Sequence, residues 1–200
     1  MGEGGELRVG GVRNMHYIEI NDFGPIENCK MNVNNFTILT GPQASGKSTI
    51  ARLVYFFLTA NDVFQSYITL DNKGEGTSLK RIAAGLRNKF ERFFGVRYSY
   101  IAFGKMSVIY HYNDNTWMKI FLNKDTANTF YVDFSFGDNF MDLIRKYEQY
   151  TAERWDDYKE KRGLQKELTN FFDMPFSSVY IPAGRSFITL LTDHISEIFV

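Results

Sequence analysis

The alternation of apolar and polar residues predicts two strands, a loop and a helix near the start of the chain. Residues 17–20 alternate, turn residues follow at 21–25, and residues 28–33 lead back, which predicts a hairpin. A short apolar strand is predicted at 36–40, and a helix at 49–58. The chain is therefore expected to begin with a hairpin, followed by a strand–loop–helix unit.

The rest of the chain alternates between helical and strand patterns. Apolar residues recur with a period of 3.6 over 78–94, which predicts a helix. Four strand-like segments follow, with spacings too short for crossover helices, so they predict an antiparallel meander: 96–103, 106–112, 117–122 and 129–134. A helical region over 139–172, broken near Gly163, precedes a strand at 178–182 and a helix from 186 onward. The predicted fold class is α/β with an antiparallel β-subdomain.

Domain organisation follows from length and from the two ends. The chain has 200 residues, which suits one domain of ordinary size. Residues 1–13 are rich in glycine, so we expect a flexible N-terminus followed by one domain over 14–200. The last helical pattern runs to Val200 without a glycine cap or a polar tail. We therefore expect the domain to be incomplete at its C-terminus.

Composition excludes several classes of protein. Lys+Arg and Asp+Glu both number 23, so contact with nucleic acid or a membrane requires a local patch. One cysteine, Cys29, allows no disulfide within the chain, and the three histidines lack the spacing of metal ligands. No apolar run approaches the ~18 residues of a membrane-spanning helix, and the first residues do not resemble a signal peptide. We expect a cytoplasmic protein that does not contact membranes.

The strongest motif is a phosphate loop at residues 41–48, which match G-x-x-x-x-G-K-[ST] at every fixed position. Its two glycines let successive backbone N–H groups point inward toward an anion, at the positive end of the following helix. The lysine reaches the β- and γ-phosphates, and the serine hydroxyl ligates Mg²⁺. The alternative is a chance glycine-rich turn, which the strand before it and the helix after it disfavour. The predicted nucleotide-binding residues are Gly41, Pro42, Gln43, Ala44, Ser45, Gly46, Lys47, Ser48 and Thr49, with Ser48 as the magnesium ligand.

Hydrolysis requires more than a phosphate loop. A nucleoside triphosphatase also needs an acid at the end of a second strand and a residue that orients water. The strand at 178–182 ends without a carboxylate, which leaves Asp133 as the only acid inside an apolar strand. Asp133 is either a catalytic acid or an ordinary residue of an edge strand, and its place in the meander favours the second. The chain thus looks able to bind a nucleotide but poorly equipped to hydrolyse it.

The segments YIEINDFGPI (17–26) and FTILTGPQASGKST (36–49) resemble the N-terminal part of SMC/RecF/OLD-type ABC ATPases. In these proteins a paired strand precedes the phosphate loop and an antiparallel β-subdomain follows it. The resemblance implies a P-loop NTPase fold, ATP and Mg²⁺ as ligands, and a homodimer with ATP between two heads. It also implies action on DNA or RNA, in DNA repair or phage defence.

The resemblance assigns further residues to the nucleotide site. Asn21 to Phe23 would lie near the base or ribose. The segment VYIPAGRS (179–186) looks like the strand-plus-Pro-x-x-Arg segment of the OLD-like branch, where Arg185 would either approach the nucleotide or cap its helix. Gln43 and Ala44 replace the usual Asn-Gly of the loop, and the family's signature motif, Asp-Glu pair and switch histidine are absent. These absences agree with a chain that covers only the first part of an ATPase head.

Basic residues gather on the predicted helix 78–94. They predict contact with the phosphate backbone of nucleic acid, and the other interpretation is a solvated helix face opposite the apolar stripe. The candidate contacts are Lys80, Arg81, Arg87 and Lys89.

Two other functions compete with the ATPase head. One is a small-molecule or nucleotide kinase, which the antiparallel strands disfavour because such kinases continue with parallel βαβ units. The other is a non-catalytic module that senses nucleotide and responds by dimerisation or partner binding.

Overall fold

The computed structural model describes residues 16–34, 36–69, 78–94, 105–153 and 158–172. Four predictions lie outside these residues: the flexible start at 1–13, the strand at 96–103, the strand at 178–182 and the helix from 186 onward. Arg185 also lies outside them.

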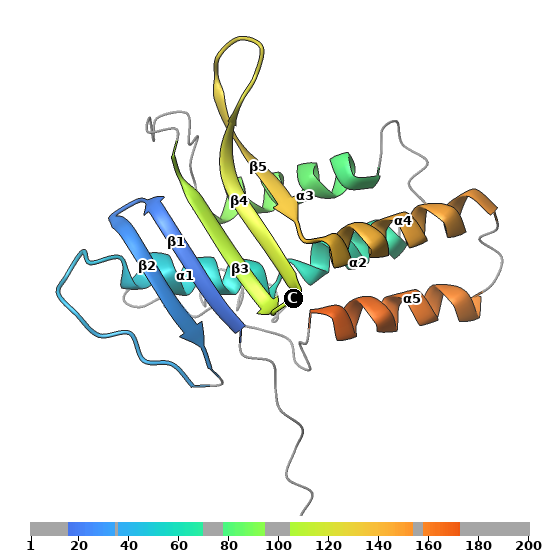
Figure 1. The fold of residues 1–200 in the computed structure, drawn as a ribbon, viewed down its shortest axis with the longest axis horizontal. Coiled ribbons are helices and arrows are strands. Elements are labelled where there is room, and N and C mark those ends of the chain that lie inside the picture. The colour runs from blue at the N-terminus through green and yellow to red at the C-terminus, as the bar shows by residue number, and fades with distance from the viewer. Residues whose placement is uncertain (1–15, 35, 70–77, 95–104, 154–157, 173–200) are drawn as a thin grey trace, which may run out of the picture.

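One antiparallel sheet of five strands organises the described residues (Figure 1). The hairpin predicted at the start of the chain and the predicted meander both form, and pairing of β1 with β3 joins them into a single sheet. The order across the sheet is β2-β1-β3-β4-β5. The strands are β1 (His16–Phe23), β2 (Ile26–Val33), β3 (Ser107–Asn113), β4 (Thr116–Lys124) and β5 (Phe130–Phe136).

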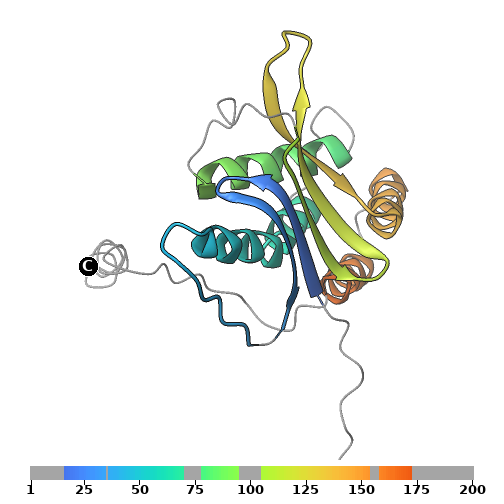
Figure 2. The ribbon, with the colours of Figure 1, turned by 60° about the vertical axis from the view of Figure 1, so that its left-hand side comes forward.

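Helices α1 and α3 cover one face of this sheet (Figures 1 and 2). The first three helices lie between β2 and β3 in sequence, and the last two follow β5. The helices are α1 (Lys47–Leu58), α2 (Asn61–Thr69), α3 (Ser78–Phe94), α4 (Asp138–Glu153) and α5 (Tyr158–Phe171). Among the described residues, no helix has the length and apolar character needed to cross a bilayer.

One helix was missed, and one predicted break was wrong. Helix α2 was not predicted although its nine residues are amphipathic, because the segment is short and begins only three positions after α1 ends. The break predicted near Gly163 is not there, since Gly163 lies inside α5, and α4 ends at Glu153 before the undescribed residues 154–157. A Cβ added at Gly163 would meet nothing within 4 Å, so the position is exposed. An exposed glycine inside a helix lowers its stability only modestly and does not have to break it.

The strand predicted at 36–40 is also not formed in the described structure. Phe36 is 80% exposed and Ile38 is 68% exposed, the two large hydrophobic side chains among the described residues that are most open to water. The apolar pattern predicts burial, but a strand also needs a neighbour that pairs with its backbone. None of the described strands pairs with this segment, and it leads into the phosphate loop without regular secondary structure.

The high aromatic content, with 19 Phe and 12 Tyr, is used in the core between the sheet and the helices. Alternate residues of the strands point inward, and Tyr110 and Tyr112 are fully buried. Phe57 of α1 stacks on Tyr110 with ring centroids 5.0 Å apart, and Phe56 stacks on Phe134 at 6.1 Å. Aromatic packing therefore fixes α1, the helix that follows the phosphate loop, against the middle of the sheet.

Candidate functional site

The phosphate loop curls tightly because three of its residues have positive φ angles. Gly41 has φ 146°, Ala44 has φ 62° and Gly46 has φ 89°. The left-handed conformation costs a non-glycine residue about 1 kcal/mol or more, so Ala44 holds local strain that glycine would not. The loop residues 41–45 are exposed, which leaves the concave side of the loop accessible to a ligand.

Gly46 is buried where the loop meets the β1–β2 turn. A Cβ at this position would lie 2.6 Å from Ile26 Cγ1 and 3.4 Å from Pro25 Cγ, so no side chain fits there. Gly46 is also the N-cap of α1, and it provides no side-chain hydrogen bond to the first turn. The first turn of α1 contains no acidic residue. Its N–H groups and the positive end of the helix dipole are therefore left for an anion.

The Lys47 ammonium folds back over the loop. Lys47 Nζ donates to the carbonyl oxygen of Gly41 at 2.8 Å, to that of Pro42, and to Ser45 Oγ at 3.2 Å. All three contacts are solvent-exposed, so exchanging these neutral acceptors for charged phosphate oxygens gains electrostatic energy at little structural cost. The positive charge already lies within the curl of the loop, where phosphate groups would bind.

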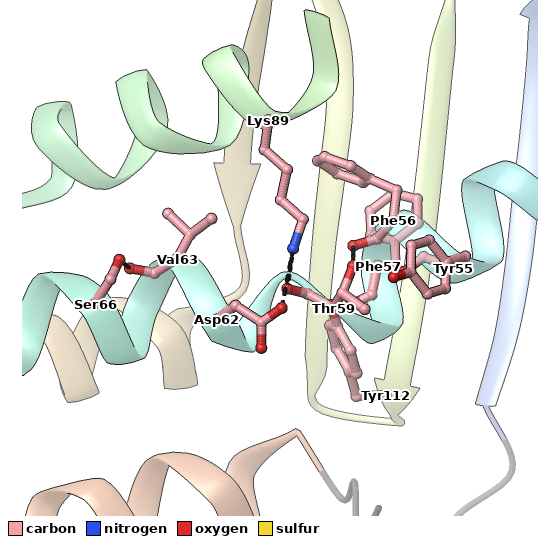
Figure 3. Close-up of polar contacts among 9 residues, drawn as sticks. All are labelled: Tyr55, Phe56, Phe57, Thr59, Asp62, Val63, Ser66, Lys89 and Tyr112. Atoms are coloured by element: carbon pink, nitrogen blue, oxygen red, sulfur yellow. Dashed lines mark hydrogen bonds and ion pairs between the residues drawn. The ribbon is translucent and has the colours of Figure 1, made fainter. Parts of the chain in front are cut away.

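The C-terminal end of α1 is held by its own C-cap residue, Thr59, and by side chains from β3 and α3 (Figure 3). Tyr112 Oη donates to the Phe57 carbonyl at 2.8 Å, and Lys89 Nζ donates to the Thr59 carbonyl. Thr59 Oγ1 donates to the Tyr55 carbonyl at 2.8 Å. The same three carbonyl groups also accept backbone N–H bonds, from Thr59 to Tyr55, from Ala60 to Phe57 and from Asp62 to Thr59, so the side chains add second bonds to them. Helix α1 is thus anchored at the end remote from the phosphate loop.

Removing the Tyr112 hydroxyl is expected to destabilise the fold by about 0.5–1.5 kcal/mol, because the Phe57 carbonyl loses a buried hydrogen bond and keeps only backbone donors such as Ala60 N, at 3.2 Å. Burial raises the pKa of Tyr112 well above its usual range, which keeps the phenol in the donating form. Chemical unfolding of Tyr112→Phe measures the loss. Tyr17→Phe is the matched control: Tyr17 contacts His111 through its ring face, so a change within about 0.5 kcal/mol is expected. Equal stability of Tyr112→Phe and wild type would contradict the anchoring role.

The structure places the β1–β2 turn, rather than the predicted residues before it, against the phosphate loop. Asn21 accepts a hydrogen bond from Asn28 at 2.8 Å across the hairpin. Phe23 is 1% exposed and packs against Phe90 and Phe94, so its ring belongs to the core and is not open to a nucleotide. The residues that do contact the loop are Pro25 and Ile26, which sequence reasoning missed. The Gly24-Pro25 turn followed by an apolar residue was the available signal.

Asp133 lies far across the sheet from the loop. It is on β5, and β3 and β4 separate β5 from β1, which corresponds to about 14 Å at the usual strand spacing. Its carboxylate pairs with Arg87 at 3.4 Å and accepts from Asn123 at 3.1 Å. The structure therefore does not bring Asp133 together with the phosphate loop and gives it structural partners instead.

The four basic residues of α3 do not form one continuous patch. Arg87 turns toward β5, where it donates to the Val132 carbonyl at 2.7 Å, whereas Lys89 turns toward α2. Arg81 lies over the Tyr67 ring at 5.0 Å, and Lys80 is exposed. Residues two apart on a helix point to nearly opposite sides, which separates Arg87 from Lys89.

Comparison with known proteins gives one match. A family model described as an AAA ATPase domain matches residues 15–178, a span that includes the phosphate loop and every described element from β1 to α5. No curated protein and no solved structure matches the chain.

Proposed function

The chain belongs to the AAA ATPase domain family, and from this premise we propose that it binds ATP with Mg²⁺ at residues 41–49. The observation that carries the proposal is the loop itself. Its positive φ angles curl the backbone, the start of α1 has no side-chain cap, and the Lys47 ammonium lies inside the curl. These features together make an anion site suited to the phosphates of a nucleotide.

In this proposal the backbone of the loop, Lys47 and Ser48 have separate tasks. Backbone N–H groups of the loop and of the first turn of α1 donate to phosphate oxygens. Lys47 exchanges the carbonyl groups of Gly41 and Pro42 for the β- and γ-phosphates. Ser48, exposed at the start of α1, supplies its hydroxyl to Mg²⁺, which neutralises phosphate charge when it is bound. The anchored C-terminal end of α1 keeps the helix and its dipole aligned with the loop.

The finer proposal is an ATPase head of the SMC/RecF/OLD kind. The order of elements along the chain supports it: a strand pair comes first, then the phosphate loop and its helix, and then antiparallel strands. Two heads would then sandwich ATP, and hydrolysis would release them. Asp133 lies on β5, far from the phosphate loop, and pairs with Arg87 of α3. We therefore propose that the catalytic groups come from a second protomer or from outside the described residues. Action on DNA or RNA, in repair or phage defence, rests on this resemblance alone, because the basic residues of α3 point in different directions.

Light scattering on the intact chain tests the head proposal. With Mg²⁺ and a non-hydrolysable ATP analogue the mass is expected to double, and with ADP it is expected to stay that of a monomer. A monomer that binds the analogue tightly would contradict the dimeric head and favour a nucleotide sensor of another kind. Transfer of phosphate to a small acceptor, with no dimer, would favour a kinase.

A further inference from the structure

An open groove of about 540 Å³ lies between α2 and α3. It adjoins the C-terminal end of α1, so the twelve residues of that helix, about 18 Å long, separate it from the phosphate loop. The groove exists partly because Gly85 has no side chain, since a Cβ there would lie 2.9 Å from Val63 Cγ1. Its volume falls in the range of small-molecule sites.

A largely buried ammonium group lies on one side of the groove (Figure 3). The Lys89 side chain is 24% exposed, and its Nζ donates to the Thr59 carbonyl. Burial lowers the pKa of Lys89, and the nearby Asp62 carboxylate acts in the opposite direction. The Lys89–Asp62 pair is long, at 3.4 Å, and Asp62 is 75% exposed. A long pair with one exposed partner is weak, so Asp62 is a partner that a better-placed anion can replace.

Other donors line the same groove, next to apolar surface. Asn88 and Arg92 stand one turn apart on α3, both exposed, and Lys89 lies between them in sequence. Val63 and Phe93 supply the apolar part of the lining. The groove thus combines an ammonium, a guanidinium and an amide with a surface that suits a hydrocarbon or aromatic body.

We propose that the α2–α3 groove binds a phosphate monoester with an apolar or aromatic body. The phosphate takes the place of the Asp62 carboxylate on Lys89 and also bonds to Arg92 and Asn88, while the organic body rests on Val63 and Phe93. A phosphate suits this set better than a carboxylate because it offers three terminal oxygens and up to two negative charges to two cations. The site is separate from the phosphate loop and gives a role to basic residues of α3 that nucleotide binding does not use.

Titration of the intact chain with phenyl phosphate tests the proposal. Wild type is expected to bind it, phenol is expected not to bind, and inorganic phosphate is expected to bind at least about tenfold more weakly because it lacks the apolar body. Arg92→Ala is expected to weaken phenyl phosphate binding by at least about tenfold. Asp62→Asn is expected to tighten it by about three- to tenfold, since the competing carboxylate is gone.

Two controls separate this groove from other anion sites. Arg145→Ala, which removes an exposed arginine of α4 that pairs with Asp142, is expected to leave the affinity unchanged. Saturating the phosphate loop with Mg²⁺ and a non-hydrolysable ATP analogue is also expected to leave the affinity of the groove for phenyl phosphate unchanged, because the loop lies at the other end of α1. The proposal is overturned if wild type does not bind, if the ATP analogue abolishes binding, or if Arg92→Ala and Asp62→Asn both match wild type.

Discussion

Replacing Lys47 with alanine is expected to weaken ATP binding by about a hundredfold or more. The ammonium is the charge that the structure places inside the phosphate loop, and a charge-assisted contact to phosphate contributes about 1.5–3 kcal/mol per bond. Because Lys47 contacts only exposed groups of its own loop, the free energy of unfolding is expected to change by less than about 0.5 kcal/mol. Calorimetric titration with Mg²⁺ and ATP measures the affinity, and thermal melting checks the fold.

Lys124→Ala is the matched control for this change. Lys124 ends β4 and lies over the Phe130 ring at 4.7 Å, on a strand remote from the loop. Its loss is expected to leave ATP affinity unchanged. If Lys47→Ala bound ATP as tightly as wild type does, the assignment of the nucleotide site to residues 41–49 would be wrong.

Replacing Gly46 with alanine is expected to impair both folding and nucleotide binding. The new Cβ would lie 2.6 Å from Ile26 Cγ1, and φ 89° is strained for any side chain. Overpacking costs about 1–3 kcal/mol and the unfavourable φ about 1–2 kcal/mol, so a loss of about 2–5 kcal/mol is expected. Either the loop or the β1–β2 turn must move, and both movements disturb the backbone N–H groups that face the phosphates.

Two further variants divide the cost at Gly46 into its parts. Gly163→Ala is the control: this glycine lies inside α5 with nothing within 4 Å of a new Cβ, so a gain of about 0.5–1 kcal/mol is expected. Combining Gly46→Ala with Ile26→Ala removes the clash but not the φ strain, so the double variant is expected to show less than the sum of the two single losses. Additive losses in chemical unfolding would show that the turn and the loop do not press on each other.

The sequence was informative wherever a local pattern determines local structure. The spacing of the phosphate loop encodes its backbone shape, and the glycines at 41 and 46 do adopt positive φ angles. The hairpin and the three described meander strands followed from alternation and turn residues. The helix predicted at 78–94 forms with those bounds, because its period of 3.6 is sustained over seventeen residues.

Features that depend on distant contacts could not be predicted in the same way. Pairing of β1 with β3 joins residues about ninety positions apart, and no pattern in either strand names its partner. The apolar residues at 36 and 38 indicated a strand, but the pattern does not supply a neighbour to pair with. The charges of α3 could be counted from the sequence, whereas their directions, Arg87 to β5 and Lys89 to α2, depend on how the helix packs.

The central claim is that ATP binds at residues 41–49, and backbone amide NMR of the intact chain with a magnesium-bound, non-hydrolysable ATP analogue tests it most directly. We expect the largest shifts at the amides of residues 41 and 43–49, since Pro42 has no amide hydrogen, with a smaller shift at Ile26, which packs against Gly46. The same titration of Lys47→Ala is expected to need about a hundredfold more analogue to reach the same shifts. Shifts confined to the α2–α3 groove or to the strands, with residues 41–49 unchanged, would contradict the claim.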